Sequence, residues 1–307
     1  MNFTHGNHLQ YTVGGRLWGH RVTCEEPYRV QVGRVDPQHF ASSDWYSEQL
    51  RTADLVWRDL GPDLVVMFSG GTDSEIVVRS FLKIGVRPRC VFIRFVGDYN
   101  AADLILAQRI CTELNLELEV IDFDVVEYYR SGRAAELSSA LQCRQIAYLS
   151  VYENIKSLQC PAVMGGEVLF RRHVDPSGSR WFYCFRENED ASAIRFSIQT
   201  GLPLVNEWFS YTPEMIAYYL QHPDIQALIS TRFNYKLASV SSKNRILNKL
   251  FDGLVPKVKT HGYEKLLGFN GETYRALAAT HPKRLASGVD GIFINDLVAQ
   301  LGISRED

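Results

Sequence analysis

Cysteine and histidine, the side chains on which protein metal sites most often depend, are sparse in this sequence and follow no metal-binding spacing. The 307 residues include six cysteines, and no two of them form a CxxC pair. The eight histidines form no HxH or HExxH pattern. These absences argue against a structural zinc site or an iron–sulfur cluster, and they predict free, buried thiols.

The sequence also lacks an excess of charge of either sign and any long apolar run. Lys and Arg total 33 against 35 for Asp and Glu, which leaves no overall field to draw the chain toward nucleic acid or a membrane. The start, MNFTHGNHLQYTVGG, has no signal-peptide features, and no stretch approaches the roughly 18 apolar residues of a membrane span. We expect a cytoplasmic protein without a membrane partner; a nucleic-acid partner is not supported by net charge, though not excluded by it.

Short apolar runs alternate with helix-like segments through the middle of the chain. Strands are expected at 64–68, 90–96, 118–123 and 162–164, and helices at 73–84, 100–114 and 134–158. Alternation of this kind builds right-handed strand–helix–strand units, which place a parallel sheet between two layers of helices. The sequence therefore predicts an α/β fold with a doubly wound parallel sheet.

The two ends of the chain differ from this central part. β-prone runs between Tyr11 and Val35 and a helix at 43–59 indicate a small N-terminal β/α element, whereas Thr212-Pro213-Glu214 opens a helical C-terminal region. Further helices are expected at 241–251, 272–285 and 289–301. We expect an accessory element at 1–60, an α/β domain at 61–200 and a helical region at 201–307.

The segment Ser69-Gly70-Gly71-Thr72-Asp73-Ser74 lies between the first expected strand of the sheet and the helix after it. At the carboxyl ends of parallel strands, a helix N-terminus presents N–H groups and the positive end of its dipole to an anion. The two glycines let the backbone approach a phosphate, the three hydroxyl groups add donors, and the carboxylate of Asp73 is suited to Mg²⁺. The segment therefore predicts a phosphate-binding loop.

Two other phosphate-binding motifs do not fit this segment. No Lys follows the glycines at the GxxxxGK[ST] spacing of a Walker loop, and the GxGxxG of a dinucleotide-binding fold is absent from it. SGGTDS instead resembles the SGGxDS signature of the PP-loop superfamily, the N-type ATP pyrophosphatases, and is closest in style to its asparagine-synthetase-like branch. The resemblance implies an adenine nucleotide alpha hydrolase-like fold, with the loop bound to the pyrophosphate part of ATP and Mg²⁺ as a second cofactor.

The resemblance also implies a reaction. A carboxylate or carbonyl oxygen of an acceptor attacks the α-phosphorus of ATP, AMP becomes attached to the acceptor, and pyrophosphate leaves. An amine or ammonia then displaces AMP. The expected acceptor is a small molecule or a nucleobase, and the nitrogen is expected from a separate donor, because the roughly 60 residues before the loop are too few for a glutaminase domain.

Two acidic positions are the metal ligands that the resemblance implies. Asp73 belongs to the loop itself, and Glu167 follows Gly165-Gly166 and the fourth expected strand. Glu167 resembles the acidic metal or substrate contact of the asparagine-synthetase-like branch, although it stands alone where that branch usually has an Asp-Glu pair. A turn followed by a solvated acid is the other interpretation of this segment.

Three basic residues complete the predicted site. Lys257 and Lys259 lie in a Pro- and Gly-bounded stretch that resembles the late basic loop over the leaving pyrophosphate, and with Asp73 and Glu167 they are the expected catalytic residues. Arg94 lies in an otherwise apolar strand, where an unpaired guanidinium is costly. It either enters the nucleotide crevice, as assigned here, or pairs with an acid at the sheet edge.

Weaker indications come from three other segments. Asn100 and Asp103 are expected as a helix cap and a first-turn acid, with nucleotide contact as the second option. Residues 142–145 are expected on the polar face of a long helix, with an acceptor contact as the second option. The aromatic segment around Trp181 is expected to form a hairpin or a lid.

Two other functions stay open beside an AMP-forming ligase or synthetase. Sulfur insertion into tRNA or another nucleobase occurs in the same superfamily, but those relatives commonly have paired cysteines and a basic face, which this sequence lacks. A non-catalytic nucleotide-binding module is the second alternative, and the intact Asp73 and Ser74 argue against it.

Overall fold

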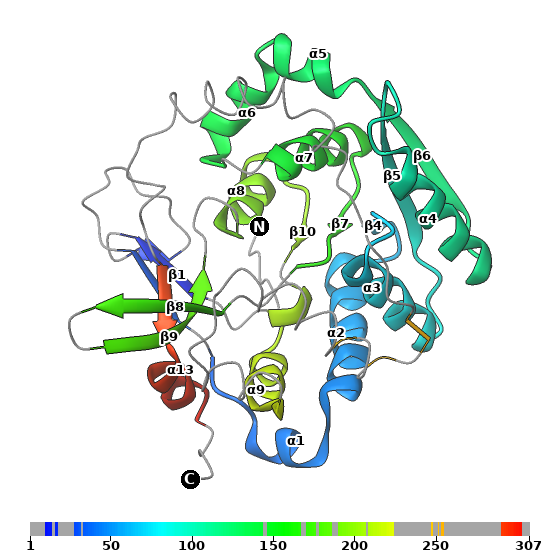
Figure 1. The fold of residues 1–307 in the computed structure, drawn as a ribbon. Coiled ribbons are helices and arrows are strands. Elements are labelled where there is room, and N and C mark those ends of the chain that lie inside the picture. Colours follow the sequence, from blue (N-terminus) through cyan, green and yellow to red (C-terminus); the bar gives the residue numbers. More distant parts are fainter. Residues whose placement is uncertain are drawn as a thin grey trace.

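The computed structural model places a parallel β-sheet at the centre of the chain, between two layers of helices (Figure 1). It describes residues 10–13, 16–17, 28–31, 33–143, 146–166, 170–175, 178–185, 190–206, 208–223, 247, 251, 253–254 and 290–302. The sheet has the strand order β10-β7-β4-β5-β6, and every neighbouring pair is parallel. The predicted α/β fold with a doubly wound parallel sheet is confirmed.

The strands of the central sheet are β4 (Val65–Met67), β5 (Arg89–Phe95), β6 (Leu118–Phe123), β7 (Ala162–Val163) and β10 (Leu204–Val205). Along the chain, the first three run from the middle of the sheet to one edge, and the last two continue on the other side of β4. The strand order therefore reverses between β4 and β7. Ligands of open parallel sheets bind outside the carboxyl ends of the strands at such a reversal.

Two layers of helices cover the sheet. One face packs against α2 (Trp45–Leu60), α3 (Thr72–Lys83), α4 (Ala101–Glu113) and α9 (Pro213–Gln221). The other face packs against α5 (Val125–Arg130), α6 (Arg133–Leu141), α7 (Ile146–Leu158) and α8 (Asp190–Thr200). In β4, Val66 belongs to the first apolar cluster, and Val65 and Met67 belong to the second. The strand is therefore buried on both faces, as a central parallel strand must be.

The expected single helix at 134–158 is wrong, because the chain turns sharply after α6. Gln142 has a left-handed φ of 53°. Cys143 is fully buried, and its carbonyl oxygen accepts a hydrogen bond from Ser138 Oγ at 2.7 Å. This turn separates α6 from α7, so residues 142–143 do not lie on the polar face of a helix.

The N-terminal part contains the small β/α element that the sequence predicts. Strands β1 (Gln10–Val13), β2 (Arg16–Leu17) and β3 (Tyr28–Gln31) form an antiparallel sheet in the order β2-β1-β3. A short helix, α1 (Pro37–Ser42), was not predicted and precedes α2. Helix α2 ends before Gly61, as expected.

A second antiparallel sheet contains the predicted hairpin around Trp181. Strands β8 (Phe170–Asp175) and β9 (Gly178–Phe185) form the hairpin, and β11 (Asp290–Phe293) pairs with β9. The expected helix at 289–301 is therefore wrong over its first residues, because they pair as a strand; α13 begins only at Ile294 and ends at Leu301.

The three-part division of the chain stays a prediction. Strand β10 and the 3₁₀ helix η1 (Trp208–Ser210) lie beyond the expected boundary at residue 200. The helix expected at 272–285, and nearly all of the one expected at 241–251, lie outside the described residues. The backbone N–H of Val35 donates to the carbonyl of Leu301 at 2.9 Å, which ties the end of α13 to the chain before α1.

A buried carboxylate joins α2 to α9. The side chain of Glu48 is 0% exposed, and its Oε1 accepts hydrogen bonds from Thr212 Oγ1 at 2.5 Å and from Arg51 Nη1 at 2.7 Å. Thr212 also caps α9 by accepting from Met215 N. A buried acid of this kind is stable only while its partners are in place.

Replacing Glu48 with Ala should therefore lower the free energy of unfolding by about 3 kcal/mol, because Thr212 and the partly exposed Arg51 lose their shared acceptor. Urea denaturation measures this loss. The matched control is Asp54→Ala, which breaks the exposed Asp54–Arg58 pair on the same helix and should change stability little. Equal losses in the two variants would contradict the role assigned to Glu48.

Candidate functional site

The segment 69–74 forms the turn after β4 and the start of α3 at the carboxyl edge of the sheet, as predicted. The backbone N–H of Phe68 donates to the carbonyl of Val91 at 2.7 Å, which extends the pairing with β5 to the start of the turn. Gly70 has a φ of 71°, in the left-handed region that favours glycine. A Cβ at Gly70 would lie 3.0 Å from the backbone nitrogen of Ala107, so the turn packs directly on the backbone of α4.

The hydroxyl groups of the turn hold its two ends together. Ser69 Oγ and Ser74 Oγ lie 3.1 Å apart, within hydrogen-bonding distance, and Ser74 Oγ also donates to the carbonyl of Gly71 at 3.1 Å. Thr72 and Ser74 are buried, while Ser69 is half-buried. Of the three hydroxyl groups predicted to contact a phosphate, that of Ser69 is the most exposed.

Helix α3 begins without a side-chain cap. Gly71 occupies the N-cap position, and no side chain caps the first turn. By contrast, Asp44 and Thr212 cap α2 and α9 with their side chains. An N-terminus without a cap can bind an anion with its backbone N–H groups and with the positive end of the helix dipole. The start of α3 therefore has the properties of an anion site.

The end of β7 closes against the same turn. A Cβ on Gly165 would lie 2.9 Å from Asp73 Cβ and 3.2 Å from Ser74 N, so only glycine fits there without a shift. Strands β4 and β7 are neighbours, and the contact lies where the strand order reverses. The structure thus brings together two segments, 69–74 and the glycine after β7, that the sequence singled out separately.

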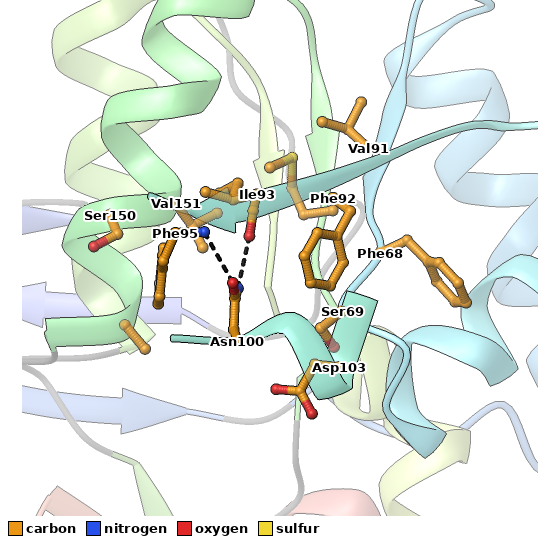
Figure 2. Close-up of a pocket in the computed structure, with 12 residues that line it drawn as sticks. Phe68, Ser69, Val91, Phe92, Ile93, Phe95, Asn100, Asp103, Ser150 and Val151 are labelled. Atoms are coloured by element: carbon orange, nitrogen blue, oxygen red, sulfur yellow. Dashed lines mark hydrogen bonds between the residues drawn. The ribbon is translucent and has the colours of Figure 1, made fainter. Parts of the chain in front are cut away.

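A cavity of about 130 Å³ lies beside the turn (Figure 2). Its walls come from the ends of β4 and β5, the start of α4, and α7. They are formed by Met67, Phe68, Ser69, Val91, Phe92, Ile93, Phe95, Asn100, Asp103, Ala147, Ser150 and Val151. Pockets that enclose drug-sized ligands measure roughly 300–1,000 Å³, so this one has room for a single ring system and not for a whole nucleotide.

Asn100 fixes the wall that β5 contributes. Its Oδ1 accepts from the backbone N–H of Phe95 at 2.9 Å, and its Nδ2 donates to the carbonyl of Ile93 at 2.8 Å (Figure 2). Asn100 occupies the N-cap position of α4, as expected, although its side chain makes no capping hydrogen bond to the helix. Asp103 lies in the first turn of α4, as expected, and is buried in the cavity wall.

Arg94 lies on β5 but is not one of the residues that line the cavity. It forms a two-fold ion pair with Asp122 on the edge strand β6, with N–O distances of 2.5 and 2.6 Å. The hydrogen bonds from Arg94 lower the pKa of the Asp122 carboxyl below its ordinary value. Of the two alternatives for Arg94, the structure shows the pair at the sheet edge, and these contacts give no support to its assignment as a nucleotide ligand.

Three predicted site residues, Glu167, Lys257 and Lys259, lie outside the described residues. Within the part of the chain that the structure describes, no group of three or more His, Cys, Asp or Glu residues is placed to hold a metal ion. Of the two predicted metal ligands, only Asp73 lies within the described residues, and its role as a ligand stays a prediction. In the same part of the chain, no helix combines the length and the apolarity that a membrane crossing needs.

The thiols that the structure describes are free, as predicted. Cys90, Cys111 and Cys143 are buried and Cys160 is partly buried. A hydrogen bond with Cys111, together with burial, raises the pKa of the Cys90 thiol. The side chains of Cys24 and Cys184 lie outside the described residues.

Sequence reasoning missed the wall of the cavity that α7 provides. Ala147, Ser150 and Val151 lie on a helix that the sequence does predict, but no local pattern marks them as ligand-facing. The crossover from β6 to β7 brings this helix to the sheet, so its position depends on the topology of the whole domain.

Comparison with known proteins gave no match in sequence: no family model and no curated protein sequence matches the chain. Among solved structures, the chain is similar to a predicted subunit of tRNA methyltransferase from Methanocaldococcus jannaschii, with 17% identity and a TM-score of 0.37 over 69% of this chain and 90% of that chain. It is also similar to the NMN synthetase from Francisella tularensis, with 16% identity and a TM-score of 0.32 over 75% of this chain and 93% of that chain. A third similar structure is the NH3-dependent NAD synthetase from Campylobacter jejuni, with 15% identity and a TM-score of 0.32 over 71% of this chain and 100% of that chain. Similarity at this level carries no argument about activity.

Substituting Gly70 with Ala should destabilise the protein more than substituting Gly85. Both glycines have positive φ, but a Cβ at Gly85 would meet nothing within 4 Å. We expect a loss of about 1 kcal/mol for Gly85→Ala from the backbone conformation alone, and about 2–3 kcal/mol for Gly70→Ala because its methyl group also meets α4. Chemical denaturation measures both. If the two losses are the same, the turn is not held against α4 as described.

Proposed function

We propose that this chain binds ATP with Mg²⁺ at the turn 69–74 and uses it to adenylate an acceptor oxygen, with release of pyrophosphate. One observation carries the proposal: an uncapped helix N-terminus follows a glycine-lined turn at the point where the strand order reverses. The contact of Gly165 with Asp73 and Ser74 supports it, because it brings a second strand end to the same turn.

The cavity is suited to the adenine ring of this nucleotide. Its walls are mostly apolar, and its volume of about 130 Å³ matches one ring system. Ser69 belongs both to the cavity wall and to the turn, so a single ligand can occupy both. We infer that the base lies between β5 and α7 and that the phosphates extend over the start of α3, where N–H groups and the helix dipole stabilise negative charge.

The residues at the turn fit a magnesium ion that is held partly by its substrate. Mg²⁺ sites in nucleotide enzymes commonly use one or two carboxylates, with phosphate oxygens and water as the remaining ligands. Asp73 supplies one carboxylate from the first turn of α3. Glu167, two positions after Gly165 in the sequence, is proposed as the second.

The proposed reaction begins when the acceptor oxygen attacks the α-phosphorus. The bond from the α-phosphorus to the bridging oxygen breaks, and pyrophosphate leaves with the electron pair of that bond. Lys257 and Lys259 are proposed to neutralise its charge together with the start of α3. An amine or ammonia then displaces AMP from the acceptor, and ATP is consumed to AMP and pyrophosphate.

The buried thiols argue against sulfur insertion as the alternative. Chemistry with a cysteine requires an accessible thiolate, whereas among the described residues Cys90, Cys111 and Cys143 are buried and Cys160 is partly buried. The side chains of Cys24 and Cys184 lie outside the described residues. A module that binds the nucleotide without catalysis is the second alternative, and it differs from the proposal in the exchange reaction described next.

Wild-type protein should catalyse ATP-dependent exchange of labelled pyrophosphate in the presence of a suitable acceptor. Asp73→Ala should abolish exchange because the metal loses its ligand, and Ser69→Ala should weaken ATP binding by about 1.5–3 kcal/mol because a charge-assisted hydrogen bond is lost. Binding is measured by calorimetry with ATP and Mg²⁺. Asp63→Ala, an exposed acid at the opposite end of β4, is the control and should change neither quantity.

Binding of ATP without exchange, over a broad panel of carboxylate and carbonyl acceptors, would favour the non-catalytic module. Equal ATP binding by wild type, Asp73→Ala and Ser69→Ala would remove the turn from the proposal altogether.

A second variant tests the contact between β7 and the turn. Gly165→Ala places a methyl group 2.9 Å from Asp73 Cβ, and the start of α3 must shift to accommodate it. We expect ATP to bind at least about tenfold more weakly, because the N–H groups no longer point at the phosphates with the same geometry. Calorimetry gives the affinity and circular dichroism checks the fold. A folded variant with wild-type affinity would show that this contact has no part in binding.

A further inference from the structure

Asn206, directly after β10, has a buried carboxamide that no group in the described protein satisfies. The residue is 3% exposed, and neither its Oδ1 nor its Nδ2 has a hydrogen-bond partner among the residues that the structure describes. Asn154 on α7 is also buried, but its Nδ2 donates to the carbonyl of Ser150 at 2.8 Å. Leaving a buried donor and a buried acceptor unpaired costs stability, and native proteins seldom retain both without a ligand or water to satisfy them.

The position of Asn206 in the sheet relates it to the turn at 69–74. Val205 is paired with Val163, and the backbone N–H of Met164 donates to the carbonyl of Val205 at 2.7 Å. The ends of β10 and β7 are therefore aligned, and Asn206 is the first residue after β10. The next residue of that segment, Gly165, contacts Asp73. Asn206 consequently belongs to the carboxyl edge of the sheet, on which ligands of this fold class bind.

Three regions of this edge can be distinguished by strand. The cavity lies on the β5 side of β4, the uncapped start of α3 follows β4 itself, and Asn206 follows β10 on the opposite side. Neighbouring strands are about 4.8 Å apart, so the end of β10 lies roughly 10 Å from the end of β4. Asn206 thus lies on the side of the turn away from the cavity.

We propose that Asn206 recognises the acceptor substrate, and that the acceptor carries an amide-type edge at that point. This inference rests on the proposed function, in which ATP occupies the cavity on the β5 side and the turn at 69–74. A carboxamide or a lactam presents a donor and an acceptor side by side, and it satisfies both unpaired atoms of Asn206. A carboxylate accepts only, so it would leave Oδ1 unpaired and facing another oxygen. The recognised edge lies apart from the oxygen that attacks the α-phosphorus, because of the distance between β10 and β4.

The test compares benzamide with benzoate, which carry a carboxamide and a carboxylate, respectively, on the same ring. Saturation-transfer NMR is recorded on the full chain with a non-hydrolysable ATP analogue and Mg²⁺. We expect benzamide to bind at least about tenfold more tightly than benzoate, and Asn206→Leu to remove that preference. Asn206→Leu should also raise the Tm, because it removes two unpaired polar atoms from the interior. Asn154→Leu is the control and should leave the benzamide signal unchanged.

The ATP analogue separates this inference from the proposed function. Two outcomes, each with equal binding of the analogue by wild type and Asn206→Leu, would show that the role of Asn206 is wrong while the ATP site stands. In the first, wild type binds benzamide no more tightly than benzoate. In the second, Asn206→Leu still binds benzamide more tightly than benzoate. If wild type does not bind the analogue, the proposed function fails first. A preference lost in Asn206→Leu, with analogue binding retained and a raised Tm, supports the acceptor site.

Discussion

The close approach of backbone to backbone around the turn after β4 is the constraint on which the rest of this structure depends. Gly70 lets the turn lie on α4, and Gly165 lets the end of β7 lie on the start of α3. A side chain at either position would separate elements that must be in contact. The two glycines thus join both halves of the sheet at the point where the strand order reverses, and the first turn of α3 lies at that junction.

The junction combines an uncapped helix start with a small apolar cavity. An uncapped helix start attracts an anion, and the nearest described cation on β5, Arg94, is held by Asp122 at the far edge of the sheet. In the proposed function, positive charge for the phosphates comes from the start of α3, from Mg²⁺ and from Lys257 and Lys259. The small apolar cavity next to Ser69 adds a place for a ring, which is the combination that a nucleotide requires.

The sequence predicts those features that arise from local chemistry. The apolar runs of the sheet, the turn at 69–74 and the helix start at Thr212 all follow from residues that are adjacent in the chain. The break after α6 depends on the hydrogen bond between Ser138 and Cys143, and β11 is a strand only because β9 pairs with it. The cavity wall from α7, the partner of Arg94 and the unpaired amide of Asn206 are likewise set by contacts between distant segments, which periodicity and spacing do not encode.

The reversal of strand order also affects when the site can exist during synthesis. A ribosome releases the turn and α3 long before Gly165, since β5, β6 and the crossover helices are made in between. A nascent chain that ends after β6 therefore has the turn proposed to bind phosphates but lacks the glycine that packs against it. Domains generally fold as units as they emerge, so only chains that have added β7 to the sheet have the turn and Gly165 in contact. In the proposed function, ATP binding is in this way confined to molecules whose central sheet is already assembled.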